Sequence, residues 1–203
     1  MIYYFDNYDS LPLERYKELL PKERAERFER FRQQRDKENC LAAYLLLKYA
    51  LKQWGIDRFD IDKDENGKPF LKNENIHFNI SHCQLGLAVA VSTDEVGIDI
   101  QDIEPYRLKL AKRVCTQEEL KFIENSSNRD RTFTRLWTLK EAAAKESGDG
   151  IKVLDDFSFE YCENRFEKYG KIFTTFEKEN LFISVCGSEN FSDIIEIKDL
   201  EVF

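Results

Sequence analysis

The first candidate chemistry lies in a short apolar stretch that carries small or polar residues at every second position. The segment 96–101 reads VGIDIQ, so a strand would place Gly97, Asp99 and Gln101 on one face and the apolar residues on the other. Oxygen-bearing side chains at positions i and i+2 then point the same way, which suits a hard cation such as Mg²⁺. The competing interpretation is an ordinary polar strand face turned to water.

A second candidate lies in a predicted helix around Trp137. At about 100° per residue the apolar side chains form one continuous arc. Lys140 falls inside this arc, and Glu141 and Lys145 lie just beyond its edge. A carboxylate for a metal, flanked by two ammonium groups for phosphate, is what pyrophosphate chemistry needs. The competing interpretation is a Lys140 that stretches to water beside a surface Glu141–Lys145 pair at i,i+4 spacing.

Other polar residues occupy turns and helix surfaces. His82 follows Ser81 at the exit of a predicted strand, where it is either structural or a donor to a phosphate. Lys68 lies in the segment GKP at 67–69, which is most simply a turn with a solvated lysine. Arg24 and Arg27 read most simply as part of an exposed helical face. None of these residues indicates a site by itself.

The elements that must position these residues alternate between helical and extended stretches. Helices are predicted over 11–20, 22–32, 36–54, 108–115, 117–124 and 129–147. Strands are predicted over 76–80, 85–91, 96–101, 157–161, 171–176, 181–186 and 194–197. Asn66 and Gly67 mark a tight turn, and Thr116 with Glu119 matches a capping box, which gives Glu119 a structural explanation. This order of elements indicates an α+β protein.

Composition restricts the class of protein more weakly. The chain has 203 residues, enough for one large domain or two small ones, and a formal net charge of −8, which argues against nonspecific nucleic-acid binding. Its five cysteines form no C-x-x-C pair, so we expect reduced thiols. The start of the chain lacks the pattern of a signal peptide, and no run of about 20 apolar residues offers a membrane span. We therefore expect a cytoplasmic protein.

Taken in chain order, four segments resemble the Sfp-type phosphopantetheinyl transferase family. They are GKP at 67–69, FNISH at 78–82, GIDIQ at 97–101 and WTLKEAAAK at 137–145. Each motif is modest alone, but the four together, in this order and spacing, are highly specific. The resemblance covers the middle of the chain, and the final segment adds little beyond its β-rich pattern.

The resemblance implies a set of site residues. Asp99 and Glu141 match Mg²⁺-binding carboxylates, and Gln101 occupies a position that is often Glu. Positions that contact the phosphates of coenzyme A, or line its site, are matched by Lys68, Ser81, His82, Lys140 and Lys145. Arg24 and Arg27 fall near the basic segment that meets the 3′-phosphate of the nucleotide.

The resemblance also implies a fold, a pseudo-twofold pair of α+β halves with the active site in the cleft between them. We expect the N-terminal half over 1–101 and the C-terminal half over 102–203. Two departures from the family pattern affect the site. Gln101 replaces a carboxylate, so the metal site is weaker or water completes it, and Asn39 stands near where many members carry a basic residue for the nucleotide.

The implied reaction is a Mg²⁺-dependent transfer of 4′-phosphopantetheine from coenzyme A to a serine of an apo acyl or peptidyl carrier protein, releasing adenosine 3′,5′-bisphosphate. Lys145 and His82 would add charge or donors around the pyrophosphate. Glu141 first, Glu119 second, or a metal-bound water would accept the serine proton. We expect a monomer that docks its carrier near 108–124 through an apolar patch with basic residues. The rival is a module that binds coenzyme A or a carrier without turnover.

Overall fold

The computed structural model describes residues 1–149, 157–159 and 163–200. Its α-helices are α1 (Leu13–Tyr16), α2 (Lys22–Arg30), α3 (Gln34–Gln53), α4 (Leu108–Val114), α5 (Gln117–Glu124) and α6 (Arg129–Ser147). Its strands are β1 (Ile2–Phe5), β2 (Ile61–Lys63), β3 (Pro69–Leu71), β4 (His77–His82), β5 (Leu87–Ser92), β6 (Val96–Asp102), β7 (Arg165–Lys168), β8 (Lys171–Glu177), β9 (Leu181–Gly187) and β10 (Ile194–Ile197). Two 3-10 turns, η1 (Tyr8–Ser10) and η2 (Lys17–Leu19), lie in the N-terminal segment. The α+β class is confirmed.

The strands form two four-stranded sheets and a separate hairpin. The first sheet has the order β10-β1-β5-β4, the second has the order β6-β9-β8-β7, and β2 pairs with β3. Neighbouring strands are antiparallel except for β1 and β10, which run parallel. Because β6 pairs with β9, the division between the sheets falls between β5 and β6, before the predicted boundary at residue 101. The late strand β10 joins the first sheet.

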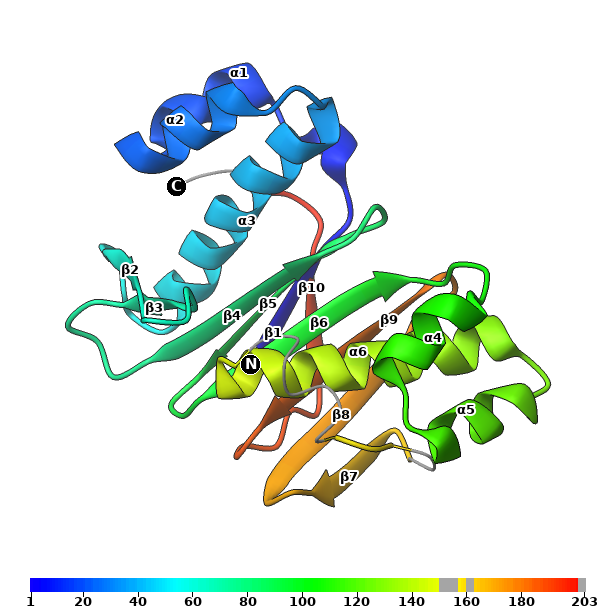
Figure 1. Cartoon of the computed structure of the whole chain (residues 1–203). Helices are drawn as coiled ribbons and strands as arrows, with labels where there is room; N and C mark the ends of the chain where they lie inside the picture. Colours follow the sequence, from blue (N-terminus) through cyan, green and yellow to red (C-terminus); the bar gives the residue numbers. More distant parts are fainter. Residues whose placement is uncertain (150–156, 160–162, 201–203) are drawn as a thin grey trace.

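Each half places a long helix against its sheet, so the halves have similar architecture (Figure 1). Helix α3 packs on the first sheet, in a core that includes Tyr3, Phe5, Leu46 and Val89. Helix α6 packs on β6 and β9 of the second sheet, and α4 and α5 contribute to the same core. A third core joins the opposite faces of the two sheets, with residues such as Tyr4 from β1, Ile98 from β6 and Ile183 from β9. Within the described residues no helix is long and apolar enough to cross a membrane.

Local sequence signals account for the ends of α6 and the start of α5. Asn128 caps α6 by accepting the backbone N–H of Arg131, and Gly148 ends the helix with a φ of 81°. The capping box predicted at Thr116 and Glu119 is present at the start of α5. The long helix was predicted to begin at residue 36, but α3 begins two residues earlier and Asp36 lies in its first turn. There a carboxylate still stabilises the helix by facing its positive end.

The helices predicted over 117–124 and 129–147 agree with α5 and α6 at both ends, and 108–115 differs from α4 by one residue. The stretch 11–20 forms α1 and η2 rather than one helix, and 22–32 shortens to α2. The strand predicted over 157–161 lies partly outside the described residues, and 157–159 form no strand. Strands β1, β2, β3 and β7 were not predicted, because short strands carry little periodic signal.

The two halves meet where β6 lies beside β4, and side chains make the connection. The backbone N–H of Ile98 donates to Asn79 Oδ1 at 3.0 Å, and that of Ile100 donates to Ser81 Oγ at 3.4 Å. These two N–H groups point away from β9, and a further strand would normally bond them. Side chains of β4 take that place, so the backbone of β6 is satisfied without a continuous sheet. We call this contact the β4–β6 seam.

Gly97 lets α6 approach β6 closely. A Cβ atom at Gly97 would lie 2.0 Å from the carbonyl oxygen of Ala142 and 2.4 Å from the backbone nitrogen of Glu146. Both atoms belong to the backbone of α6, so no rotamer change can make room. Gly97 and Asp99 share a strand face, and the close contact therefore also brings Asp99 to α6.

We predict that Gly97→Ala lowers the free energy of unfolding by about 3 kcal/mol or more, because helix and strand must separate to admit one methyl group. The matched control is Gly187→Ala on the neighbouring strand β9, where the added Cβ would meet no atom nearer than 3.2 Å. Urea unfolding of the three proteins measures the difference. Equal stabilities for the two variants would contradict the close helix–strand contact.

Candidate active site at the β4–β6 seam

Asp99 is the centre of a buried polar cluster at the seam. Its side chain is 2% exposed, although carboxylates are rarely buried without a partner. Oδ1 accepts hydrogen bonds from Ser81 Oγ at 2.8 Å and from Lys145 Nζ at 2.6 Å. Oδ2 accepts from the Gln101 amide nitrogen at 3.3 Å. The face that carries Asp99 is therefore turned to α6, and the alternative of a polar face in water is wrong.

Lys145 reaches Asp99 from the last turns of α6. Its ammonium also donates to Ser81 Oγ at 2.9 Å, so three groups from β4, β6 and α6 form one hydrogen-bonded triangle. The alternative of a surface pair between Glu141 and Lys145 is not what the structure shows. The salt bridge joins Lys145 to Asp99 across the fold instead. Such a pair fixes the helix relative to the strand.

Glu141 lies one turn before Lys145 on α6 and faces the same cluster. Burial raises the pKa of Glu141, and the nearby charge of Asp99 raises it further, while Lys145 lowers it. Two carboxylates therefore share one poorly solvated region with a single ammonium group. That arrangement leaves an excess of negative charge, which a further cation would offset.

Asp99, Glu141 and Gln101 offer a set of hard oxygen donors. No group of three or more His, Cys, Asp or Glu side chains able to hold a metal occurs in the part of the chain that the structure describes. Two carboxylates and an amide nevertheless fit Mg²⁺, which binds through one or two carboxylates and keeps several waters. Burial raises the pKa of Glu141 and the like charge of Asp99 raises it further, and this incompletely compensated pair of carboxylates is the observation in favour of the fit. Gln101 and Asp99 contact each other as the strand period predicts.

His82 borders this cluster at the end of β4. Its Nδ1 lies 3.4 Å from the amide nitrogen of Asn39 on α3, and Asn39 Oδ1 accepts from the hydroxyl of Tyr8 at 2.8 Å. Partial desolvation by the surrounding residues lowers the pKa of His82, although the side chain keeps an exposed face, and the charge of Lys145 lowers it further. His82 is thus a largely neutral imidazole between the two halves. The partners Asn39 and Tyr8 were not predicted, because their contact spans distant parts of the sequence.

The two arginines of α2 stack on aromatic rings. The Arg24 guanidinium lies 5.7 Å from the centre of the Tyr44 ring and donates to the carbonyl oxygen of Cys40 at 3.5 Å. Arg27 lies 5.5 Å from the Phe31 ring and is exposed. Burial lowers the pKa of Arg24, and the charge of Arg27 helps to lower the pKa of His82. Arg27 therefore lies within electrostatic reach of the seam.

Lys68 connects the β2–β3 hairpin to the end of α6. Its ammonium donates to the carbonyl oxygen of Glu146 at 2.7 Å and pairs with the carboxylate of Glu95. A lysine at a helix C-terminus interacts favourably with the helix dipole. The reading of Lys68 as a solvated turn neighbour is wrong, since its side chain is only 14% exposed. Its hydrogen bonds do not connect it to Asp99 or Lys145.

Lys140 and Glu119 form a separate ion pair inside the C-terminal half. Both side chains are 0% exposed, and Lys140 Nζ lies 2.8 Å from Glu119 Oε2. Lys140 also donates to the carbonyl oxygen of Phe157 at 2.5 Å, and Glu119 Oε1 accepts from the backbone N–H of Phe159 at 2.8 Å. A lysine inside an apolar arc needs an anion as partner, and here the protein itself supplies it. Neither phosphate contact by Lys140 nor proton transfer by Glu119 follows from this geometry, and snorkelling to water is also wrong.

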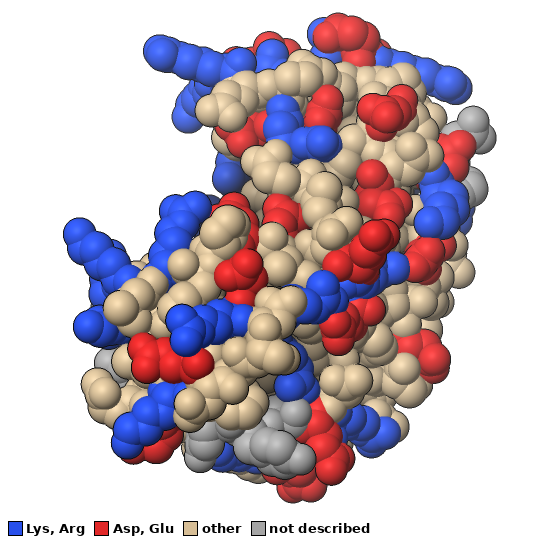
Figure 2. All heavy atoms as spheres, turned by 90° about the vertical axis from the view of Figure 1, so that its right-hand side faces the viewer, with Lys and Arg blue, Asp and Glu red and all other residues tan. Residues whose placement is uncertain are grey.

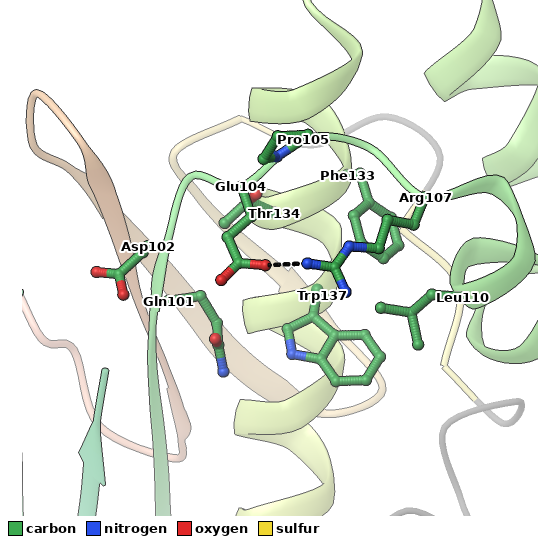
Figure 3. Close-up of a pocket in the computed structure, with 9 residues that line it drawn as sticks. All are labelled: Gln101, Asp102, Glu104, Pro105, Arg107, Leu110, Phe133, Thr134 and Trp137. Atoms are coloured by element: carbon green, nitrogen blue, oxygen red, sulfur yellow. Dashed lines mark hydrogen bonds and ion pairs between the residues drawn. The ribbon is translucent and has the colours of Figure 1, made fainter. Parts of the chain in front are cut away.

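A pocket opens beside the cluster, between the end of β6, the following loop and α6 (Figure 3). Gln101 and Trp137 form its wall toward the seam, and Arg107 and Glu104 form an ion pair at 3.1 Å beside it. Figure 3 shows the Gln101 side chain turned toward the Trp137 indole, whereas Asp102 points away from it. The full set of lining residues is Gln101, Asp102, Glu104, Pro105, Arg107, Leu110, Phe133, Thr134 and Trp137. The motifs identified Gln101 and Trp137, but not the loop residues.

The molecular surface is hollowed between the upper part, which carries α1 and α2, and the lower part (Figure 2). Lys and Arg side chains project from both parts beside this hollow. The net charge of −8 is therefore unevenly distributed. Asp and Glu side chains also lie at the hollow in Figure 2, so the projecting Lys and Arg side chains can attract an anionic ligand only locally.

We predict that Lys140→Met lowers the free energy of unfolding by about 3–5 kcal/mol, because Glu119 is left buried without a cation. The control Lys121→Met removes an exposed lysine from α5 and should change stability by less than about 0.5 kcal/mol. The double variant Glu119→Gln/Lys140→Met should recover much of the loss. Denaturant unfolding measures all three, and equal losses for the two single variants would contradict the buried pair.

The raised pKa of Glu141 predicts a pH-dependent stability. A carboxyl group whose pKa is raised by folding stabilises the fold while it is protonated, and this contribution is lost as the pH rises through the folded-state pKa. Glu141→Gln should therefore raise the melting temperature of metal-free protein at pH 7 by a few degrees. The difference in melting temperature between Glu141→Gln and the native protein should vanish below roughly pH 4, where Glu141 is protonated in both the folded and the unfolded state. Melting curves in a chelating buffer test this, and an advantage that grows on acidification would reverse the assigned direction.

Comparison with known families accounts for most of the chain. Residues 12–94 match the model of the 4′-phosphopantetheinyl transferase N-terminal domain, and residues 95–194 match that of the 4′-phosphopantetheinyl transferase superfamily. The two matches meet between β5 and β6, where the two sheets also divide. This two-part match agrees with the pseudo-twofold pair of halves.

Curated relatives are also named 4′-phosphopantetheinyl transferases. The chain is 31% identical to 4′-phosphopantetheinyl transferase Sfp of Bacillus subtilis over 71% of its own length and 68% of that protein. It is 33% identical to 4′-phosphopantetheinyl transferase gsp of Aneurinibacillus migulanus, over 65% and 57% of the two chains. It is 30% identical to a putative 4′-phosphopantetheinyl transferase of Haemophilus influenzae, over 67% and 57%. The seam residues, the two domain matches and these relatives agree, and the chain belongs to the 4′-phosphopantetheinyl transferase superfamily, a family of enzymes.

Proposed function

We propose that the protein transfers the 4′-phosphopantetheine group of coenzyme A to a serine of an apo acyl or peptidyl carrier protein and releases adenosine 3′,5′-bisphosphate. The observation that carries this proposal is the buried cluster of Asp99, Lys145 and Glu141, bordered by His82 from the other half. It combines carboxylates for a cation with donors for phosphate at one place. The transferase names of the relatives support the same activity.

Asp99, Glu141 and Gln101 are the residues that would hold Mg²⁺. When bound there, the ion would neutralise charge on the pyrophosphate of coenzyme A. Lys145 already supplies one positive charge to Asp99 at 2.6 Å. Ser81 orients Asp99 by donating to Oδ1, so the direction of the carboxylate does not depend on a ligand.

The basic residues would bind different phosphates of coenzyme A. Lys145 and His82 would donate to pyrophosphate oxygens, and Arg24 and Arg27 on α2 would face the 3′-phosphate. Arg24 is stacked and partly buried, so its guanidinium loses little freedom on binding a phosphate. Lys68 would act indirectly by holding the end of α6, since its ammonium is engaged there.

Glu141 would act as general base. Its raised pKa improves its ability to accept a proton, although a carboxylate bound to a cation is a weaker base. The serine hydroxyl would pass its proton to Glu141 while its oxygen forms a bond to the β-phosphorus. The bond from that phosphorus to the bridging oxygen then breaks, and adenosine 3′,5′-bisphosphate leaves with the electron pair. Glu119 has both carboxylate oxygens engaged in the core and takes no part.

The carrier protein would dock beside the pocket formed by β6, α4 and α6. Leu108 at the start of α4 is 42% exposed and Arg107 precedes it, which supplies an apolar and a basic contact. We propose that the enzyme works as a cytoplasmic monomer. The amide of Gln101 also favours a second candidate function, a module that binds coenzyme A or a carrier without turnover, because it weakens the attraction for a cation.

Incubation with apo acyl carrier protein, coenzyme A and Mg²⁺ distinguishes the two candidates. We predict a carrier heavier by one phosphopantetheine in the mass spectrum. Asp99→Asn and Glu141→Gln should each reduce the rate by about a hundredfold or more, because each removes one of two charges assigned to the cation. The control Asp94→Asn alters an exposed carboxylate in the β5–β6 loop and should be near native. Coenzyme A binding without any modified carrier would favour the binding module.

We predict that Gln101→Glu lowers the Mg²⁺ concentration for half-maximal transfer, because a third carboxylate adds attraction to the ion. The maximal rate should change less than the midpoint. Gln101→Ala should cost little if water already shares this coordination position, and more if the amide binds directly. A Mg²⁺ titration of carrier modification compares the three proteins. An unchanged midpoint for Gln101→Glu would place the amide outside the shell of metal ligands.

A further inference from the structure

Asn39 is a buried amide between a tyrosine and a histidine. It lies on α3 and is 7% exposed. Its Oδ1 accepts from Tyr8 Oη at 2.8 Å, and its amide nitrogen lies 3.4 Å from His82 Nδ1. The three side chains come from η1, α3 and β4, so they connect the N-terminal segment to the edge of the candidate active site. Asn39 carries no charge of its own to offer a ligand.

Tyr8 determines the orientation of that amide. Its ring packs edge-on against the Phe5 ring, with 5.5 Å between the ring centres. The guanidinium of Arg35, on α3, lies 4.0 Å from the centre of the Tyr8 ring. The hydroxyl of Tyr8 donates to Asn39 Oδ1, and burial raises the pKa of Tyr8, so the hydroxyl keeps the proton that it donates. A donor at this position requires the amide oxygen of Asn39 to face it. The amide NH₂ group must then face His82.

The tautomer of His82 follows from that orientation. An NH₂ group that faces Nδ1 can only donate, so Nδ1 must be bare and the proton must lie on Nε2. Among the described residues, the imidazole has its hydrogen-bond partner, Asn39, at Nδ1, which leaves Nε2 without a protein partner on a side chain that is exposed overall. Charged groups that influence the ring are Lys145 on α6, Arg27 on α2, Asp36 on α3 and Asp99 on β6.

We propose that Asn39 is a positioning residue that, held by Tyr8, keeps the proton of His82 on Nε2 and presents this N–H to a phosphate oxygen of coenzyme A. The identity of the ligand rests on the proposed function, whereas the tautomer rests on the hydrogen bonds alone. Asn39 then acts on the ligand through His82. A neutral donor of fixed direction binds a phosphate oxygen without requiring a protonated histidine.

The chain contains two histidines, and the second is an internal control. His77 Nδ1 lies 3.0 Å from a carboxylate oxygen of Glu95. A carboxylate accepts hydrogen bonds, so it favours a proton on Nδ1 of His77. The two imidazoles are therefore expected to be opposite tautomers in one protein.

Two-bond ¹H–¹⁵N NMR spectra of labelled protein distinguish a protonated ring nitrogen from a bare one. Spectra are recorded at roughly pH 8, above the usual histidine pKa, and His77→Gln and His82→Gln assign the signals. We expect the proton of His82 on Nε2. In Asn39→Asp it should move to Nδ1, because a carboxylate can only accept. Tyr8→Phe should give a mixture, whereas the control Tyr16→Phe, in the same core, should leave His82 unchanged.

Steady-state kinetics with coenzyme A and a carrier provide the second readout. Asn39→Ala should raise KM for coenzyme A about tenfold with a smaller change in kcat, since a misdirected donor weakens binding of the phosphate. A wild-type His82 protonated on Nδ1, or a tautomer unaffected by Asn39→Asp, would overturn the positioning role even if transfer occurs. The expected tautomers without any transfer would contradict the proposed function instead. Normal KM values for Asn39→Ala, with the tautomer lost, would exclude His82 from ligand binding.

Discussion

Two backbone N–H groups on one edge of β6 determine how the halves of this protein meet. Those of Ile98 and Ile100 point away from β9, and each would cost about 1–3 kcal/mol if buried without an acceptor. Asn79 and Ser81 accept them with side chains rather than with a strand backbone. The sheet is therefore interrupted at this point without leaving buried groups unsatisfied. Ser81 has a second bond, to Asp99, so the same residue that joins the halves also orients the carboxylate.

The site that results is stabilised by contacts outside it. Asp99 and Glu141 share a poorly solvated space with only Lys145 for compensation, and this burial raises the pKa of Glu141. Such a cluster is unfavourable for folding unless a ligand binds. The buried pair of Lys140 and Glu119 lies on the opposite side of α6 and has its charges matched within the core. One helix thus carries a lysine that holds the fold and a lysine that faces the site, five residues apart.

Local sequence signals predicted the elements well and the partners poorly. Caps such as Asn128 and Gly148 limit α6, and the two-residue period placed Asp99 and Gln101 on one face, as the structure confirms. The partner of Lys140 was not predicted, because helix geometry shows that a buried lysine needs an anion but not which one. The seam, the pairing of β1 with β10 and the contact of Asn39 with His82 join residues far apart in sequence, and no local period encodes them.

If side chains of β4 satisfy the outer edge of β6, the backbone amide of Ile98 must be protected from hydrogen exchange by Asn79. In the native protein this amide should be protected nearly as strongly as amides between β8 and β9, because its acceptor is the buried Asn79 side chain. In Asn79→Ala its exchange should accelerate by about tenfold or more relative to those amides. Rapid exchange of Ile98 in the native protein, or protection that survives Asn79→Ala unchanged, would contradict the seam.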